Sequence, residues 1–268
     1  LSNPTIPAGF KPVATTTSSW TDGEDGKPST TSLNNGLVIE DTKGNQFVWI
    51  PVDGTNLKYE KHTYTQANNA GTNLADDSGW RTWYYRNYTD WTDDGGNSAS
   101  VAQYGGFYIA RYEAGIPENA PFYGSEDGDN YYKTEKNVTT YTPVSKKGYP
   151  AWNFITQPNA KTVAGKMYNT SSVKSSLVDS RAWDTVTTWL QNKGYNVNNS
   201  ASWGNYITSS YSINGLYALH IYNNNTWTPA STYSKGSHSI ANGDRTETAT
   251  GITDRNKANN IYDFAGNM

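Results

Sequence analysis

Cysteine is absent from this chain of 268 residues, and histidine occurs only three times, as His62, His220 and His238. Without cysteine, these residues can form no disulfide, no thiolate zinc site and no thiol nucleophile. The histidines do not recur at a metal-ligand spacing such as H-x-x-x-H. We therefore expect hydrogen-bonded or solvated histidines, and the alternative is a three-histidine metal site assembled from distant loops.

The chain also has no cluster of basic residues and no long apolar run. Its net charge is −3, and phosphate binding needs concentrated Lys and Arg, so nucleic acid is not an expected partner. No apolar stretch reaches the roughly 18 residues of a transmembrane helix, so we expect no membrane span in these residues. The small aliphatic share argues against a parallel α/β sheet, whose buried strands need long Val, Ile and Leu runs.

Aromatic residues are abundant instead. They make up 14% of the chain, with 10 Trp and 21 Tyr against 6 Phe. Trp and Tyr bury large areas while keeping one polar atom for a partner. We expect most of them in the core and the remainder, together with Asn and Ser, on an aromatic and polar binding face.

Composition divides the chain into an arm and one domain. Residues 1–36 are rich in Ser, Thr, Gly and Pro and are predicted to form an extended N-terminal arm with turns. In the remaining domain, 37–268, the segment 47–52 is apolar on both faces, which predicts a buried central strand. A second strand is expected from Gly106 to Glu113, and short strands are possible within 215–222.

Two helices are predicted from the spacing of apolar residues. The first begins near Pro158, because proline is favoured in a first helical turn. The second runs from Ser180 to Asn192, with Asp179 or Ser180 as its cap. We expect Gly194 to stop it and its apolar face to carry Trp183, Val186, Trp189 and Leu190.

Paired carboxylates occur in Gly-rich polar stretches. Asp76-Asp77, Asp93-Asp94 and the acidic run at 126–129 offer the two carboxyl groups that a glycosidase needs. We expect solvated turn carboxylates there instead. The sequence also lacks the G-x-S-x-G elbow of a hydrolase.

Short motifs recur along the chain in a defined order. Q-F-V-W-I-P-V at 46–52 and G-G-F-Y-I-A-R-Y-E at 105–113 have the form of two strands, and S-R-A-W-D at 180–184 precedes S-W-G-N-Y at 202–206. The sequence I-Y-D-F-A-G-N-M follows at 261–268. Together these motifs resemble the formylglycine-generating-enzyme family, a branch of the C-type-lectin fold. The resemblance implies an α+β domain of that fold, with a small twisted antiparallel sheet, two helices and much irregular loop structure.

The resemblance also implies where metal chemistry would lie. The family's oxidases use a cysteine pair and copper, and this pair falls downstream of the motif at 261–268. A metal-dependent oxidase whose catalytic segment lies beyond Met268 is therefore an alternative function. The same motif builds a calcium site in the family, which implicates Asp263, Gly266 and Met268 here, with a Glu ligand two residues after the last one. The alternative is that Asp263 and Asn267 brace a turn.

The resembled fold pairs its two chain ends as neighbouring strands. From this we expect the domain to be incomplete at its C-terminal end, with further residues or a strand-donating partner chain covering the sheet near 47–52. An exposed edge there would otherwise favour aggregation.

The function expected from these observations is non-catalytic recognition or adhesion on a bacterial or phage surface. The partner would be a protein or glycan ligand on another cell or particle. Similar proteins include pilin-like and prophage-encoded proteins and the variable proteins of diversity-generating retroelements; a structural subunit of a surface filament or phage particle is a further alternative. The expected ligand-binding residues are aromatic and polar side chains of two long loops: Trp80, Trp83, Tyr84, Tyr85, Trp91, Trp203, Asn205, Tyr206, Tyr222 and Trp227.

Overall fold

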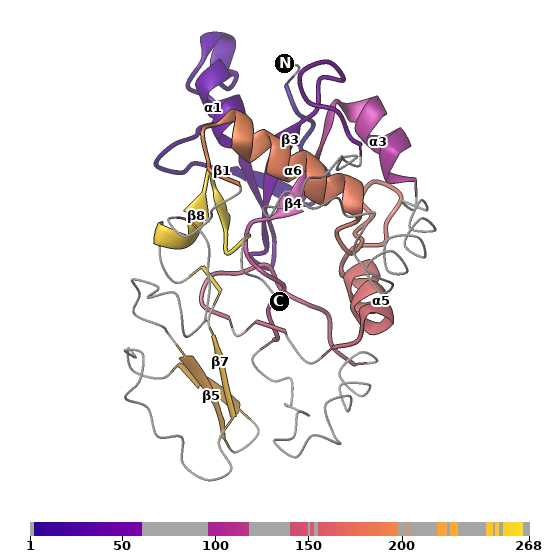
Figure 1. Cartoon of the computed structure of the whole chain (residues 1–268), viewed down its shortest axis with the longest axis vertical. Helices are drawn as coiled ribbons and strands as arrows, with labels where there is room; N and C mark the ends of the chain where they lie inside the picture. Colours follow the sequence, from indigo (N-terminus) through magenta and orange to yellow (C-terminus); the bar gives the residue numbers. More distant parts are fainter. Residues whose placement is uncertain are drawn as a thin grey trace, which may run out of the picture.

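The computed structural model is an α+β arrangement built around a small antiparallel sheet (Figure 1). Its described residues are 3–60, 96–117, 140–149, 151–152, 155–197, 203, 219–223, 226–229, 245–248, 250–251 and 254–264. Among these residues, no helix combines the length and the apolar character that crossing a membrane would require.

The main sheet has four strands in the order β1-β2-β3-β4. They are β1 (Phe10–Val13), β2 (Val38–Asp41), β3 (Gln46–Pro51) and β4 (Gly106–Ala110). The central buried strand predicted at 47–52 is confirmed by β3, which lies between β2 and β4. The second predicted strand is confirmed in part, because β4 ends at Ala110 and not at Glu113.

No open edge lies beside β3 in the described part of the chain, and the expected incompleteness of the domain at its C-terminal end stays a prediction. A tight hairpin pairs β2 with one side of β3, and β4 pairs with the other side. The hairpin forms because the Asp41 carboxylate accepts hydrogen bonds from the backbone N–H groups of Lys43 and Asn45, both at 2.8 Å, while Gly44 takes a positive φ of 86°. The sheet therefore needs no further strand at this position.

One face of the sheet is covered by α6 (Ser180–Asn192). Val186, Trp189 and Leu190 of this helix pack with Val48 and Ile50 of β3 in the largest apolar cluster. The predicted helix and its cap are confirmed: it starts after Asp179, whose carboxylate accepts a 2.8 Å hydrogen bond from the N–H of Ala182.

The predicted position of Trp183 on the apolar face of that helix is wrong. We expected it on the buried face, but it is 41% exposed, whereas Trp189 is 2% exposed. Six residues separate the two, which places them about 120° apart around an α-helix. The buried stripe runs from Thr185 through Trp189 and Val186 to Leu190, so it extends to the Trp189 side of Val186 and leaves Trp183 just outside it.

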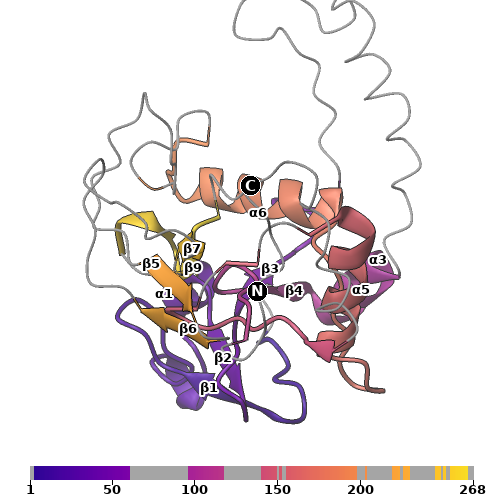
Figure 2. The same ribbon diagram turned by 90° about the horizontal axis from the view of Figure 1, so that it is seen from below.

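Two further helices lie beyond the β4 edge of the sheet. They are α3 (Asn97–Tyr104) and α5 (Gln157–Met167), and Figures 1 and 2 both place them on the side of β4 away from β1. The helix predicted near Pro158 is confirmed by α5, which has this proline in its first turn. No sequence pattern predicted α3.

Part of the segment expected as an extended arm is ordered secondary structure. It contributes β1, a 3-10 turn η1 (Glu24–Gly26) and the helix α1 (Thr30–Asn35). Leu33 is buried, and the indole N–H of Trp20 donates a 2.7 Å hydrogen bond to the carbonyl of Val38 in β2. The segment adopts this structure because its few apolar side chains reach the sheet and Ser29 caps α1.

The last described segment fastens to this N-terminal region. After the 3-10 turn η4 (Asp254–Asn256), a small hairpin pairs β8 (Lys257–Ala258) with β9 (Ile261–Tyr262). In its turn, the fully buried amide of Asn260 donates to the Ser18 hydroxyl at 3.0 Å and to the Gly36 carbonyl at 2.8 Å. The hairpin is thereby held against residues more than two hundred positions earlier.

A second sheet has the order β6-β5-β7. Its strands are β5 (Leu219–Asn223), β6 (Thr226–Pro229) and β7 (Arg245–Thr248), and Figure 1 shows it at the far end of the molecule from α1. The possible strand at 215–222 corresponds to β5.

Candidate ligand-binding groove

A groove of about 660 Å³ follows the outer edge of β4. From β3 only Phe47 and Trp49 line it, which are alternate residues on one face of the sheet. From β4 all residues of 106–110 line it. Successive strand residues point to opposite faces, so a groove that touches every residue of β4 must run along its edge.

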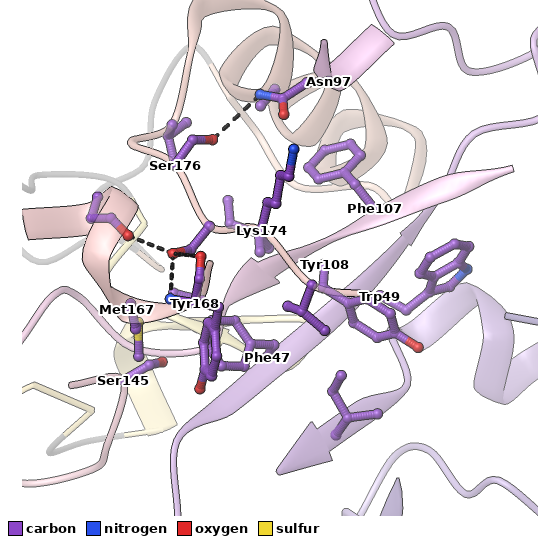
Figure 3. A pocket seen from close by; sticks show the side chains of 18 of the residues that line it. Phe47, Trp49, Asn97, Phe107, Tyr108, Ser145, Met167, Tyr168, Lys174 and Ser176 are labelled. Atoms are coloured by element: carbon purple, nitrogen blue, oxygen red, sulfur yellow. Dashed lines mark hydrogen bonds between the residues drawn. The ribbon is translucent and has the colours of Figure 1, made fainter. Parts of the chain in front are cut away.

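The opposite wall of the groove is built from α3 and the segment 172–179. The amide of Asn97 bridges the two, donating to the Ser176 hydroxyl at 3.4 Å and to the Asp179 carboxylate at 3.0 Å. Figure 3 shows Asn97 and Ser176 at one end of the pocket and Lys174 standing between this wall and Phe107. Lys174 is exposed.

Asp179 organises the end of the groove next to α6. Its carboxylate accepts from the Tyr59 hydroxyl at 2.8 Å as well as from Asn97, in addition to capping α6. The Tyr59 ring in turn meets the Phe107 ring edge to face, with centroids 5.3 Å apart. This carboxylate therefore holds the walls together and is already engaged by three donors.

Aromatic rings form the floor on the outer face of the sheet. Tyr168 lies against both Phe10 and Phe47, with ring centroids 5.3 and 5.6 Å apart. Its hydroxyl donates a 2.6 Å hydrogen bond to Asp41. Burial and this hydrogen bond raise the pKa of Tyr168, whereas for Asp41 the bonds from Asn45 and Tyr168 outweigh burial and lower its pKa.

A second aromatic pair covers the start of β4. The rings of Trp49 and Tyr108 lie 4.9 Å apart, and the Tyr108 hydroxyl donates to the Thr5 carbonyl at 3.0 Å. Gly106 makes this packing possible, because a Cβ there would collide with the Trp49 indole and the Ile50 carbonyl. Burial raises the pKa of Tyr108, so its hydroxyl stays protonated and remains a donor.

Two carboxyl groups lie where the groove approaches β9. Burial, together with the negative charge of Asp263, raises the pKa of Glu113 to about 8. Burial also raises the pKa of Asp263. Beside them, the Tyr112 and Tyr262 rings stack with centroids 5.1 Å apart. Glu113 is therefore largely uncharged at neutral pH.

Asp263 braces a turn through both carboxylate oxygens. One accepts from the N–H of Gly251 at 2.7 Å and the other from the Asn256 amide at 3.2 Å, while Asp263 itself has a positive φ of 54°. The other two residues predicted to bind calcium, Gly266 and Met268, lie outside the described residues. Within the described part of the chain, no group of three or more His, Asp or Glu side chains is placed to hold a metal. Calcium binding at Asp263 stays a prediction.

The predicted ligand-binding residues have different outcomes. Trp203 is corrected: it is 6% exposed, its ring meets Tyr195 edge to face, and its indole N–H donates to the Asn196 carbonyl at 3.2 Å, so it belongs to the core. Tyr222 and Trp227 lie opposite each other in the pairing of β5 with β6, which the structure describes for the backbone. The remaining predicted residues lie outside the described residues: Trp80, Trp83, Tyr84, Tyr85, Trp91, Asn205 and Tyr206.

Sequence reasoning did not find the groove. Its walls come from segments far apart in the chain, around residues 5–10, 97–110 and 164–183. One local feature of the sequence does point to it. Phe107 and Tyr108 are adjacent aromatic residues in a strand, so one of them must face away from the core.

Comparisons of this chain with protein-family models, curated proteins and solved structures found no significant match. The resemblance to the formylglycine-generating-enzyme family thus rests on the sequence motifs.

Proposed function

We propose that this chain is a non-catalytic recognition module of the C-type-lectin fold, displayed on a bacterial or phage surface. It binds a protein or glycan ligand in the groove beside β4. The observation that carries the proposal is the groove itself, whose volume of about 660 Å³ lies within the range of ligand sites and whose lining combines aromatic rings with small polar groups.

Two polar groups of this groove already have structural partners, which disfavours them as catalytic groups. Asp179 accepts from three donors, and the Tyr168 hydroxyl is bonded to Asp41. A general acid or base must exchange a proton with its substrate, and such engagement opposes that exchange. The half-buried rings that line the groove suit ligand recognition, because stacking on them adds about 0.5–1.5 kcal/mol per aromatic pair beyond buried area.

Binding to glycan and peptide arrays tests the proposal. Val178 lines the groove and is 42% exposed, so Val178→Arg should obstruct the groove without disturbing the core. Gln191, on the exposed side of α6, gives the matched control Gln191→Arg with the same added charge. We expect Val178→Arg to weaken binding at least about tenfold, a loss of about 1.4 kcal/mol, and Gln191→Arg to bind like the parent.

Two results would contradict the proposal. One is the absence of binding to any glycan or peptide. The other is copper-dependent thiol oxidation by the protein, which would favour the alternative of a metal-dependent oxidase.

A further inference from the structure

We infer that the ligand in the groove is an extended segment of another polypeptide, which pairs with β4 as a fifth strand and places an acidic side chain near Lys174. This inference rests on the proposed function and names the chemical class of its ligand. It follows from the hydrogen-bonding groups of the β4 edge and from the charges along the groove.

The ladder between β3 and β4 fixes which way each backbone group points. At one end the N–H of Val52 donates to the Gly105 carbonyl at 2.9 Å, and at the other the N–H of Arg111 donates to the Gln46 carbonyl at 3.0 Å. In an antiparallel pair, hydrogen-bonded positions alternate with positions that are not bonded across the pair. Every second residue of β4 between these ends therefore points its backbone groups away from β3.

The outward residues are Gly106, Tyr108 and Ala110, while Phe107 and Ile109 bond to β3. Pro51 agrees with this assignment, because it lies opposite Gly106 and has no N–H to donate. Outside the pairing with β3, no backbone hydrogen bond of these three outward residues is found within the residues that the structure describes.

These outward groups open into the groove, because all of 106–110 line it. A five-residue strand spans about 17 Å, and three of its residues offer one donor and one acceptor each in strand spacing. A polypeptide backbone carries the matching alternation, whereas a glycan does not. Main-chain pairing of this kind supplies affinity, and alternate side chains of the added strand supply specificity.

The side chains of an added strand would meet aromatic rings on both faces. On one face lies the half-buried Tyr108, packed over the buried Trp49, and on the other lie Tyr59 and Phe107. Alternating residues of the ligand therefore have apolar surface to contact whichever way they point. We expect Val, Ile, Thr or aromatic residues at these positions.

Charge in the groove selects an acidic side chain in the ligand. Lys174 is exposed on the wall opposite β4. Among the described residues, ion pairs join Lys11 to Glu40 and Lys257 to Asp254, and Lys174 forms no ion pair with any described residue. The nearby Asp179 carboxylate is bonded to Tyr59 and Asn97 and caps α6. An anionic ligand side chain would pair with Lys174 at the groove wall.

The experiment begins with a phage-displayed library of random dodecapeptides selected on the immobilised protein. The selected peptides should alternate apolar and polar residues and contain an acidic residue. Amide hydrogen exchange is then followed by NMR on the ¹⁵N-labelled protein with one such peptide. Exchange at Gly106, Tyr108 and Ala110 should slow at least about tenfold on binding, while Phe107 and Ile109, already bonded to β3, should change little.

Paired substitutions test the same geometry. Ala110→Pro removes an outward N–H but no bond to β3, and proline is tolerated on strand edges; Ala110→Val keeps that N–H. We expect the first to lose peptide binding at least about tenfold and the second to retain it. Lys174→Gln should weaken acidic peptides and leave their glutamine versions unchanged. If the Ala110→Pro variant does not fold, the amide-exchange measurement on the parent protein still shows whether the peptide pairs with β4.

Each outcome bears on the inference. Peptide binding that leaves amide exchange at the three outward residues unchanged would overturn strand addition but keep the proposed function. Binding of glycans and of no peptide would have the same two consequences. Concentration-dependent protection of these amides in the peptide-free protein would assign the groove to a second copy of this chain instead. Binding of neither peptides nor glycans would overturn the proposed function as well.

Discussion

The hydroxyl of Tyr168 donates a hydrogen bond of 2.6 Å to the carboxylate of Asp41 and so joins the segment after α5 to the end of β2. The Tyr168 ring packs against Phe10 and Phe47, which makes it the contact through which the groove floor is held to the sheet. A carboxylate at the hairpin turn thus supports an aromatic surface of the groove.

Removing this hydroxyl should destabilise the protein in a pH-dependent way. We expect Tyr168→Phe to cost about 1.5–3 kcal/mol at neutral pH, the usual contribution of a hydrogen bond to a charged group. The bond helps to lower the pKa of Asp41 below its usual value of 3.8, so its contribution is present above pH 3.8 and is lost as the pH falls further. Urea unfolding at pH 7 and pH 3 measures this.

The control for that substitution is Tyr104→Phe, because Tyr104 is 47% exposed. It should unfold like the parent at both pH values. Equal losses for Tyr168→Phe at pH 7 and pH 3 would mean that the charge on Asp41 is not involved.

Glu113 should make the protein lose stability as the pH rises from about 4.5 to about 8. Its pKa is raised from about 4.5 to about 8, so between these values the folded state holds a proton that the unfolded state has released. Stability then falls as the pH rises through this window. Glu113→Gln resembles the protonated carboxyl, and it should match the parent at pH 4 and exceed it by on the order of 1 kcal/mol or more at pH 9. A parallel pH dependence of parent and variant in thermal unfolding would refute this.

The two tryptophans of α6 should differ sharply in their contribution to stability. Trp189 is 2% exposed within the main cluster, so Trp189→Ala should cost about 3–5 kcal/mol. Trp183 is 41% exposed and stacks on Phe264 with ring centroids 4.2 Å apart, so Trp183→Ala should cost clearly less, although the stacking adds about 0.5–1.5 kcal/mol beyond the buried area that is lost. Denaturant unfolding of both variants provides the comparison, and similar losses would place Trp183 in the core after all.

Asp263 should be needed for stability with or without calcium. Asp263→Ala leaves the Gly251 N–H and the Asn256 amide buried without their acceptor, a loss of about 1–3 kcal/mol. Asp263→Asn keeps one acceptor oxygen and should cost less, and Glu24→Ala at an exposed carboxylate should cost little. Thermal unfolding in EDTA and in calcium chloride completes the test. A rise in the parent's melting temperature with calcium that Asp263→Ala abolishes would support the calcium site.

Local patterns in the sequence predicted the elements that depend on local interactions. The helix at 180–192 was predictable because its cap and its apolar spacing lie within one segment. The central strand was predictable because both of its faces are apolar. The exposure of Trp183 was not, since it depends on which side of Val186 the buried stripe extends to when the helix packs on the sheet. The short helix α3 carries a single buried apolar residue, Val101, and gave no periodic signal.

The groove could not be predicted because it is a product of long-range pairing. Trp49 and Tyr108 meet only once β4 lies beside β3, and Tyr168 joins them from a segment sixty residues further along. The binding residues expected from the sequence share a high aromatic content within loops. That criterion does not distinguish a core residue such as Trp203 from a ring on a groove floor.

The contacts of Asn260 set an order of events for the synthesis of this protein. Its amide closes onto Ser18 and Gly36, partners that lie 242 and 224 residues earlier in the chain. Contacts of such long sequence separation form slowly, because the intervening loop must close before they stabilise anything. A growing chain emerges from its N-terminus at about 5–20 residues per second. The region around α1 must therefore wait many seconds for its last partner, and it reaches its final packing only when almost all of these residues have been made.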